Sequence, residues 1–261
     1  MKISVVTVAL NAADTIADTL RSVAEQTHPA IEHIVVDGGS TDGTVDVVKR
    51  FGERVARLVS EPDQGLYHAM NKGIALATGE VVGTLNADDM YMHEGVLARV
   101  ASVFEDASVE ACYGDLIYVD RADTDRIVRY WTSRPYAPGL FERGWIPAHP
   151  TFFVRRSVYE RYGAFDLSYR IQSDFELTMR LLAVHGIRSV YIPEILVRMR
   201  MGGTTNRRVM NVVRGNLESY RAARSHGLGV TPWFFVVKIL SRVPQFFRRP
   251  RLERREERAE D

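Results

Sequence analysis

The sequence predicts an α/β fold with a Rossmann-like, mostly parallel central sheet that is flanked by helices. Two observations predict it. Segments with helical periodicity separate four short β-branched runs, which are residues 3–9, 31–36, 55–60 and 81–85. In addition, polar residues follow the first, second and fourth runs within two positions. Strands that alternate with helices at such short intervals form right-handed parallel units. We therefore expect one doubly wound sheet with polar groups at one rim.

Composition sets the limits on size and partners. The chain has 261 residues, of which 46% are hydrophobic, enough for a sizeable core in one large domain. Residues 1–206 contain 21 Lys/Arg against 27 Asp/Glu, and residues 207–261 contain 13 against 6. The acidic body argues against a nucleic-acid surface, and the basic tail favours an anionic partner.

Cys112 is the single cysteine of the chain, so no disulfide framework is expected and a reducing compartment is favoured. The N-terminus lacks the features of a signal peptide. No apolar run approaches the roughly 20 residues that a membrane-spanning helix needs. We therefore expect a cytoplasmic protein.

The segment Glu80–Asp89 runs from a buried strand directly into two adjacent carboxylates, Asp88 and Asp89. Such carboxylates are costly unless positive charge compensates them, and ligands bind at this end of the strands in open α/β sheets. Mg²⁺ or Mn²⁺ carrying a phosphorylated ligand satisfies both conditions. The alternative is a turn that caps the next helix.

The segment Asp37–Thr44 is a glycine-rich turn between a strand and a helix, which is typical of a nucleotide-binding crossover. It is not the G-x-G-x-x-G fingerprint of dinucleotide-binding dehydrogenases. Asp37 can accept a hydrogen bond from a base N–H or a ribose hydroxyl. The alternative is that Asp37 and Ser40 only shape the turn.

The segments Thr7–Asn11, Val35–Thr44 and Glu61–Asp89 resemble the donor half of family 2 glycosyltransferases, in particular bacterial enzymes that assemble polysaccharides or glycolipids. The resemblance covers roughly the first 200 residues. It implies a glycosyltransferase A-type fold and transfer of a sugar from a nucleotide diphosphate donor, usually with inversion and with Mn²⁺ or Mg²⁺. Uridine is the nucleoside that the resemblance favours.

The resemblance also implies site residues. The family's D-x-D motif falls on Asn86-Ala87-Asp88, so Asp88 matches the metal-binding carboxylate and Asp89 is an additional contact to the metal shell or the donor. Asn86 departs from the usual first Asp, although its amide can still bind a ribose hydroxyl. The nucleotide-binding candidates are Thr7, Ala9, Asn11, Asp37, Asp63, Asn71, Lys72, Asn86 and Ala87.

The middle of the chain breaks the parallel pattern, so we divide a catalytic domain, 1–205, into a donor half, 1–104, and an α+β acceptor half, 105–205. The expected elements are a helix at 94–104, a strand at 111–118, a hairpin from 116–119 to 127–131, and two short strands around Pro193. Trp145 and His149 are acceptor-side candidates, because sugars stack on aromatic rings. Packing of a long loop onto the core explains them equally well.

Asp174 is the candidate catalytic base. It lies in Gln172–Leu177 at the start of a helix, where Ser173 or Asp174 also suits a cap. By the resemblance, an E-D pair here supplies the base that deprotonates the acceptor hydroxyl; Ser173 replaces the Glu and Asp174 matches the base. Glu176 is the less favoured alternative.

Residues 198–206 are expected to form a basic loop, and the resemblance implies that Arg198, Arg200 or Arg207 closes over the donor diphosphate. A solvated basic surface is the alternative. Residues 206–261 are predicted as a basic, amphipathic helical extension that lies in a bilayer interface at the inner face of the membrane, with a disordered end. The alternative is a helix packed back on the domain or across a homodimer.

The leading hypothesis is thus an inverting, metal-dependent transferase that uses a saccharide or lipid-linked acceptor. A sugar-phosphate nucleotidyltransferase is a second class, but it would normally show a glycine-rich basic loop after the first strand, and residues 10–14 have neither glycine nor a basic residue. A non-catalytic nucleotide-sugar-binding module is a third class. Retention of Asp88 and Asp174 argues against it.

Overall fold

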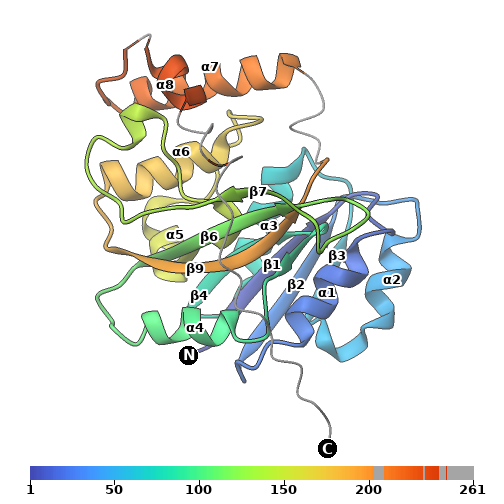
Figure 1. Ribbon diagram of the computed structural model, residues 1–261. Helices are drawn as coiled ribbons and strands as arrows, with labels where there is room; N and C mark the ends of the chain where they lie inside the picture. Colours follow the sequence, from blue (N-terminus) through green and yellow to red (C-terminus); the bar gives the residue numbers. More distant parts are fainter. Residues whose placement is uncertain (203–208, 232, 241–244, 246–261) are drawn as a thin grey trace, which may run out of the picture.

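The computed structural model describes residues 1–202, 209–231, 233–240 and 245 (Figure 1). Its donor half contains four parallel strands in the order β3-β2-β1-β4, with β1 at Ile3–Ala9, β2 at Ile31–Asp37, β3 at Arg57–Ser60 and β4 at Val81–Asn86. The predicted parallel sheet is confirmed. The third strand starts at Arg57 instead of residue 55, because a 3₁₀ turn, η1 (Gly52–Arg54), occupies the preceding residues.

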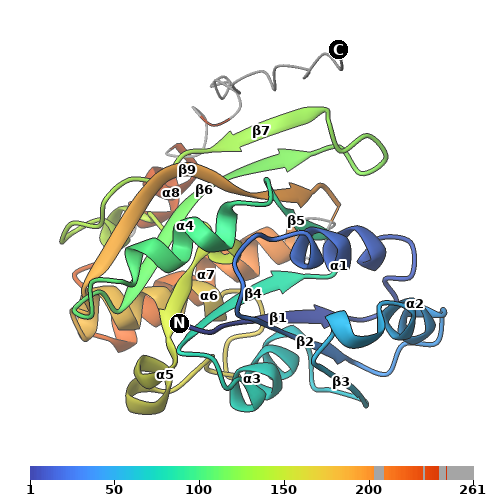
Figure 2. The same cartoon turned by 90° about the horizontal axis from the view of Figure 1, so that it is seen from below.

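Helices cover both faces of these strands. One face carries α1 (Ile16–Ala24), α2 (Thr44–Arg50) and α4 (Val96–Val103), and the other carries α3 (Leu66–Leu76). Figure 2 shows α1 and α4 on the side of β1 and β4 opposite to α3. Because side chains alternate along a strand, Val6 and Val8 pack toward α3 while Ile3 and Val5 pack toward α4. This two-sided burial explains the continuous apolar runs.

The acceptor half extends the same sheet with mixed pairing. β4 pairs antiparallel with β8 (Phe153–Arg155), β8 antiparallel with β6 (Ala111–Val119), and β6 parallel with β9 (Ser189–Arg200). β7 (Ile127–Trp131) completes the predicted hairpin with β6, and β5 (Asp89–Tyr91) pairs antiparallel with β9. The remaining elements of this half are η2 (Phe141–Arg143), η3 (His149–Thr151), α5 (Arg156–Tyr162), α6 (Ser173–Met179) and η4 (Arg180–Val184).

The expectation of two short strands around Pro193 was wrong. β9 is one strand of 12 residues. Pro193 lies where the register against β6 shifts, between the pairs Tyr113–Tyr191 and Asp115–Ile195. Proline lacks the N–H that a regular ladder needs and is tolerated at such an irregularity.

The expectation that the basic loop begins at Arg198 was also wrong. Arg198 and Arg200 belong to β9 and pair with β5 and β6. Two neighbouring strands satisfy the backbone of these residues, so they cannot move as a free loop. Arg207 lies outside the described residues.

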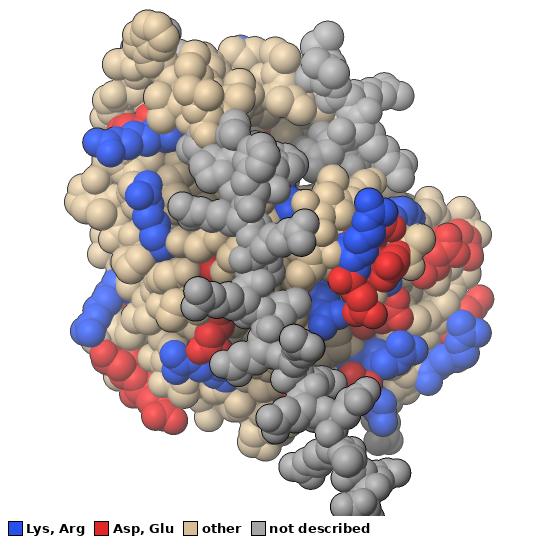
Figure 3. All heavy atoms as spheres, in the orientation of Figure 1, with Lys and Arg blue, Asp and Glu red and all other residues tan. Residues whose placement is uncertain are grey.

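The C-terminal extension contributes α7 (Val209–Ser225) and α8 (Phe234–Leu240), which lie beside α6 (Figure 1). Ala222, Ala223 and Phe234 are buried in the same core cluster as Phe175 of α6. The α7–α8 region, at the top of Figure 3, shows few charged side chains on the visible face. Among the described helices, none is long and apolar enough to cross a bilayer.

Candidate active site

The carboxyl ends of β1 and β2 meet in one network. Asp37 accepts hydrogen bonds from the backbone N–H groups of Gly39 (3.1 Å) and Ser40 (2.9 Å) and from the Ser60 hydroxyl (2.7 Å). These contacts show that Asp37 shapes the turn after β2, as the alternative interpretation expected. Nucleoside binding by Asp37 remains a prediction.

The loop after β1 is tied to the loop after β2. Asn11 adopts a left-handed conformation (φ 49°), its N–H donates to Ser40 Oγ (2.7 Å), and its Oδ1 accepts from Thr41 N–H (3.0 Å). Asparagine tolerates this conformation better than most residues. Further down β1, Thr7 is buried and its hydroxyl lies 2.9 Å from His33 Nε2. Ala9 ends the strand as a buried residue, and its carbonyl accepts the N–H of Gly38 at 2.8 Å.

Asp63 lies next to the turn that follows β2. A Cβ added at Gly38 would lie 2.5 Å from Asp63 Oδ2, so the glycine lets the carboxylate approach the turn after β2. Lys72 forms an ion pair with Glu61 at 2.7 Å. Both side-chain atoms of Asn71 bind the Phe165 backbone, at 2.8 and 2.9 Å, so Asn71 joins α3 to the acceptor half and has no contact that supports its predicted nucleotide role.

The carboxyl end of β4 carries the adjacent acids. Asn86 Nδ2 donates to Asp89 Oδ2 at 2.9 Å, and Asp89 is fully buried. Burial and the nearby charge of Asp88 hold the pKa of Asp89 well above its usual value. Burial also raises the pKa of half-buried Asp88, while Arg121 and Arg200 act in the opposite direction. Ala87 links this turn to the start of α1, because its carbonyl accepts from the hydroxyl of Thr15, the residue before that helix, at 2.9 Å.

Several buried polar atoms in this turn and on the neighbouring strand β9 have no hydrogen-bond partner. They are Asn86 Oδ1, Asp89 Oδ1, Arg200 Nε and Arg200 Nη1. Arg200 Nη2 donates to Asp18 Oδ2 at 2.5 Å, so only part of its guanidinium is satisfied. Buried polar groups normally have partners. Unpaired acceptors beside unpaired guanidinium donors therefore fit a ligand that brings both a cation and anionic oxygens.

A divalent cation fits these residues. The described residues hold no cluster of three or more His, Cys, Asp or Glu side chains that could bind a metal alone. Mg²⁺ and Mn²⁺ do not need such a cage, because one or two carboxylates suffice when phosphate oxygens and water complete the shell. Asp88 and Asp89 can supply the carboxylates, and a cation would offset the cost of their burial.

Asp174 lies in the first turn of α6 and is held from two sides. Its Oδ1 accepts from Phe175 N–H at 2.8 Å and from the Tyr67 hydroxyl at 3.3 Å. The residue before α6 is Gln172, and neither Ser173 nor Asp174 makes the expected cap. The tyrosine, from α3, was not identified from the sequence because it follows the ordinary periodicity of a buried helix face.

His149 contacts β4 and lies within electrostatic range of Asp174. His149 Nε2 lies 3.1 Å from Thr84 Oγ1, and Thr84 belongs to β4, two residues before Asn86. Burial lowers the pKa of His149, and the charge of Asp174 partly offsets that shift. His149 therefore contacts β4 directly, and the charge of Asp174 acts on it.

The other acceptor-side candidates have different surroundings. Glu176 is 1% exposed and accepts from Arg180 Nε (2.7 Å) and His226 Nε2 (2.8 Å), so it joins α6 to η4 and α7 and is less available to a substrate than Asp174. Trp145 packs edge-on against Phe141 at 5.3 Å between ring centroids. The buried Trp145 Nε1 and His149 Nδ1 have no hydrogen-bond partner. Arg198 pairs with Asp125 at 3.3 Å.

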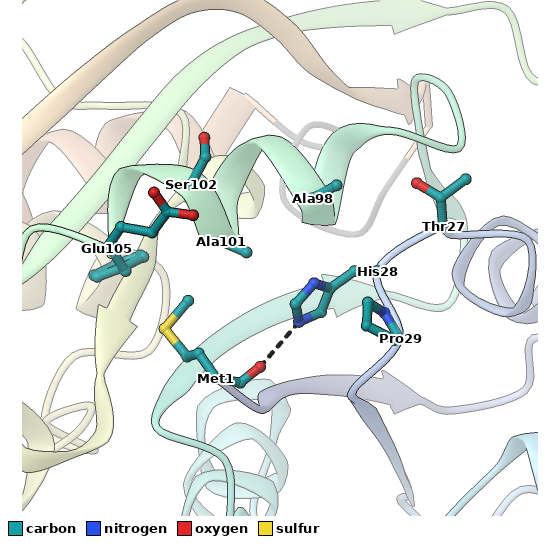
Figure 4. A pocket seen from close by; sticks show the side chains of 9 residues that line it. Met1, Thr27, His28, Pro29, Ala98, Ala101, Ser102 and Glu105 are labelled. Atoms are coloured by element: carbon teal, nitrogen blue, oxygen red, sulfur yellow. Dashed lines mark hydrogen bonds between the residues drawn. The ribbon is translucent and has the colours of Figure 1, made fainter.

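A separate pocket of about 390 Å³ lies at the opposite end of the strands (Figure 4). Met1, His28 and Pro29, near the amino ends of β1 and β2, line one side, and Ala98 and Ala101 of α4 line another. None of the predicted site residues borders it. It therefore lies apart from the residues predicted to bind the donor.

Comparison with known proteins identifies the family of the chain. The model of the family described as "Glycosyl transferase family 2" matches residues 4–163. A PGL/p-HBAD biosynthesis glycosyltransferase of Mycobacterium bovis is 32% identical over 216 residues, covering 78% of each chain. An uncharacterized glycosyltransferase of Mycobacterium tuberculosis is 31% identical over 221 residues, covering 82% of this chain and 81% of the relative.

Solved structures share the fold. TarS of S. aureus in complex with UDP has a TM-score of 0.63 at 18% identity, over 93% of this chain and 67% of TarS. The mannosyltransferase PcManGT of Pyrobaculum calidifontis, in complex with GDP-Man and Mn²⁺, has a TM-score of 0.65 at 22% identity, over 92% of this chain and 68% of PcManGT. The chain therefore belongs to glycosyltransferase family 2, has the glycosyltransferase A-type fold, and is a nucleotide-sugar-dependent glycosyltransferase.

Proposed function

We propose that this enzyme transfers a sugar, with inversion, from a UDP-sugar to a hydroxyl of a saccharide or lipid-linked acceptor in cell-surface polysaccharide or glycolipid synthesis. One observation carries the proposal: the turn after β4 holds adjacent carboxylates with unpaired buried oxygens beside unpaired donors of Arg200. A second carboxylate, Asp174 in the first turn of α6, is near enough to His149, the partner of Thr84 on β4, for its charge to act on the imidazole. Two acidic groups of this kind suit a displacement at a sugar carbon: one holds the ion that neutralises the departing diphosphate, and the other takes the proton of the attacking hydroxyl.

In this proposal the donor diphosphate lies at the turn after β4. Asp88, with Asp89 beside it, holds Mn²⁺ or Mg²⁺. The unpaired Nε and Nη1 of Arg200 donate to phosphate oxygens. The bound ion supplies charge neutralisation of the departing diphosphate. PcManGT, crystallised with GDP-Man and Mn²⁺, supports a donor and metal of this class.

The nucleoside lies along the ends of β1 and β2, where Thr7, Ala9, Asn11, Asp37 and Asp63 converge. TarS has been crystallised with UDP and with UDP-GlcNAc, whereas PcManGT binds GDP-Man. The structural relatives thus include both a uridine-nucleotide complex and a guanosine-nucleotide complex. Uridine is our choice because it is the nucleoside that the family resemblance favours.

Asp174 accepts the proton of the acceptor hydroxyl. The acceptor oxygen forms a bond to the anomeric carbon while the bond from that carbon to the nucleotide diphosphate breaks. Oδ1 of Asp174 is occupied by Phe175 N–H and the Tyr67 hydroxyl, which leaves Oδ2 to take the proton. General-base assistance of this kind contributes about 10²–10⁴-fold in rate.

The acceptor lies on the side of Trp145 and His149. The buried indole Nε1 and imidazole Nδ1 lack partners, so acceptor hydroxyl groups can satisfy both. The ring of Tyr136 stacks on the indole, and these two partly buried rings give an apolar wall of the kind that sugar faces contact.

The α8 helix suits peripheral contact with an anionic membrane at the cytoplasmic face. One side of α8 packs on the domain through Phe234 and Lys238. Its other side exposes Trp233, Val236, Val237, Ile239 and Leu240 by 39–71%. Five arginines follow in the sequence between residues 248 and 255. Aromatic and aliphatic groups next to basic ones favour an interface with anionic lipid.

Vesicle sedimentation tests this membrane contact. The full chain should bind vesicles that contain phosphatidylglycerol and not phosphatidylcholine alone, and Trp233→Ser should weaken binding. Exposed apolar helix faces also form homodimers. Dimerisation that Trp233→Ser abolishes, without vesicle binding by the wild type, would contradict the membrane assignment.

Activity against a panel of nucleotide sugars tests the function. Thermal unfolding with Mn²⁺ should show stabilisation by UDP and by one UDP-sugar, because a ligand of the folded state raises stability by mass action. Release of UDP from that sugar should require Mn²⁺ or Mg²⁺. Stabilisation by GDP-sugars alone would contradict the choice of uridine, and full activity in the presence of a chelator would contradict the metal.

A further inference from the structure

Helix α8 contributes a buried lysine to the segment that precedes Asp174. Lys238 is 1% exposed, and its Nζ donates to Ser219 Oγ at 2.6 Å and to Gln172 Oε1 at 3.2 Å. Ser219, from α7, also donates to Gln172 Oε1, at 2.8 Å. A buried lysine is costly without such partners. Two helices of the C-terminal extension thus converge on the side-chain amide of the residue just before α6.

Glu218 holds the backbone of the same segment. Its Oε2 accepts the N–H groups of Ile171 (2.8 Å) and Gln172 (3.0 Å). Hydrogen bonds to an ionised acceptor are about twice as strong as neutral ones. From the opposite side, the Tyr67 hydroxyl donates to Ile171 O at 2.8 Å and to Asp174 Oδ1 at 3.3 Å. Residues 171–174 are therefore clamped between α3 and the C-terminal helices.

Two glycines allow the close packing that this clamp needs. A Cβ at Gly144 would lie 2.5 Å from Lys238 Cβ, and one at Gly215 would lie 3.2–3.3 Å from Ile171 and Gln172. Lys238 Nζ also lies 5.1 Å from the ring centroid of Phe175, the residue after Asp174. The lysine therefore contacts the chain on both sides of the carboxylate.

We propose that Lys238 and Glu218 are positioning residues for the transfer reaction: they hold Ile171 and Gln172 in place, so that Asp174 faces the acceptor hydroxyl. The inference rests on the proposed role of Asp174 as the base. It makes α7 and α8 part of the catalytic unit, beyond any contact with lipid. A misplacement of about 1 Å in a reacting group can cost about 10²-fold in rate.

Steady-state kinetics of Lys238→Met test the proposal. The assay is Mn²⁺-dependent UDP release from the UDP-sugar that stabilises the protein most. The variant should lower kcat by about tenfold or more, with KM for the donor within about twofold, since the donor half is untouched. Arg221→Met removes an exposed cationic side chain of α7 and should leave both constants unchanged.

A double-mutant cycle separates positioning from general destabilisation. If Lys238 acts through Asp174, then Lys238→Met should cause no further loss in an Asp174→Asn background, because the positioned carboxylate is already absent. As a second probe, Gln172→Leu should lower kcat as Lys238→Met does, and Gln172→Glu, which keeps an acceptor oxygen, should recover most of it.

Two results would overturn the positioning role: wild-type kcat in Lys238→Met, or a further tenfold loss in the Asp174→Asn background. These results differ from a failure of the proposed function itself. That failure would appear as a wild-type rate in Asp174→Asn alone, and the positioning role would fall with it.

Discussion

The two acidic sites of this enzyme are held by different means. The Asn86–Asp89 turn ends a strand of a regular parallel sheet, so its place follows from the backbone pairing of β1, β2 and β4. Asp174 lies in the first turn of a short helix, and contacts from residues 67, 218 and 238 hold the segment around it. The comparison teaches that sheet topology positions the proposed donor site, whereas long-range side-chain contacts position the proposed base.

The largest predicted effect concerns stability of the donor half in acid. Burial lowers the pKa of His33, on β2, from 6.5 to about 4. The unfolded chain therefore binds more protons between these values, so stability is complete above pH 6.5 and falls as pH drops toward 4, by on the order of 3 kcal/mol. Urea unfolding of the wild type and of His33→Gln between pH 7.5 and 4 measures this. An equal pH slope in both proteins would show that His33 is not the cause.

The next effect should fall on donor binding alone. Arg200→Met removes the unpaired N–H donors beside Asp89, and we expect UDP–Mn²⁺ affinity to fall by about 10–100-fold, the range for hydrogen bonds to charged groups. Arg99→Met is a matched control, since Arg99 pairs with Glu194 on the surface. Calorimetric titration with UDP measures the change. Unaltered affinity in Arg200→Met would remove this arginine from the donor site.

A smaller effect should fall on the base alone. Tyr67→Phe removes the hydroxyl that binds both Ile171 and Asp174, and we expect kcat to fall by about tenfold with donor affinity unchanged. Tyr162→Phe, at the end of α5 and outside this network, is the control. A loss of UDP affinity instead of kcat in Tyr67→Phe would break the distinction between the two sites.

The smallest effect should come from crowding the rim. The substitution Gly38→Ala would place a Cβ 2.5 Å from Asp63 Oδ2. This oxygen lies at the end of the Asp63 side chain, which can rotate away. We expect donor affinity to weaken by a few-fold, with kcat preserved, because only one carboxylate at the nucleoside end moves. Competition between UDP and the UDP-sugar donor measures this affinity. A change in kcat with unchanged affinity would assign Gly38 to the other site.

The sequence predicted the donor half well because its information is local. Each strand is a short β-branched run, and Asp37 and Asp88 follow such runs directly, so the parallel topology brings them to one edge. The acceptor half was less predictable. Pro193 marked the end of a strand by propensity, but pairing on both sides of β9 overrode it.

The supports of Asp174 were not predicted at all. Tyr67 and Lys238 lie 107 residues before and 64 residues after it in the chain, and each follows the periodicity of an ordinary helix. No local pattern distinguishes a buried lysine that binds Gln172 from one that reaches solvent. Such contacts depend on tertiary packing, which the spacing of residues along the chain does not reveal.

The most direct test of the division between the two sites compares Asp88→Asn with Asp174→Asn in one pair of assays, UDP–Mn²⁺ binding and sugar transfer. The account predicts that Asp88→Asn loses both, and that Asp174→Asn binds UDP–Mn²⁺ like the wild type while transfer falls by about 10²-fold or more. Near wild-type transfer by Asp174→Asn, or unaltered metal-dependent UDP binding by Asp88→Asn, would contradict it.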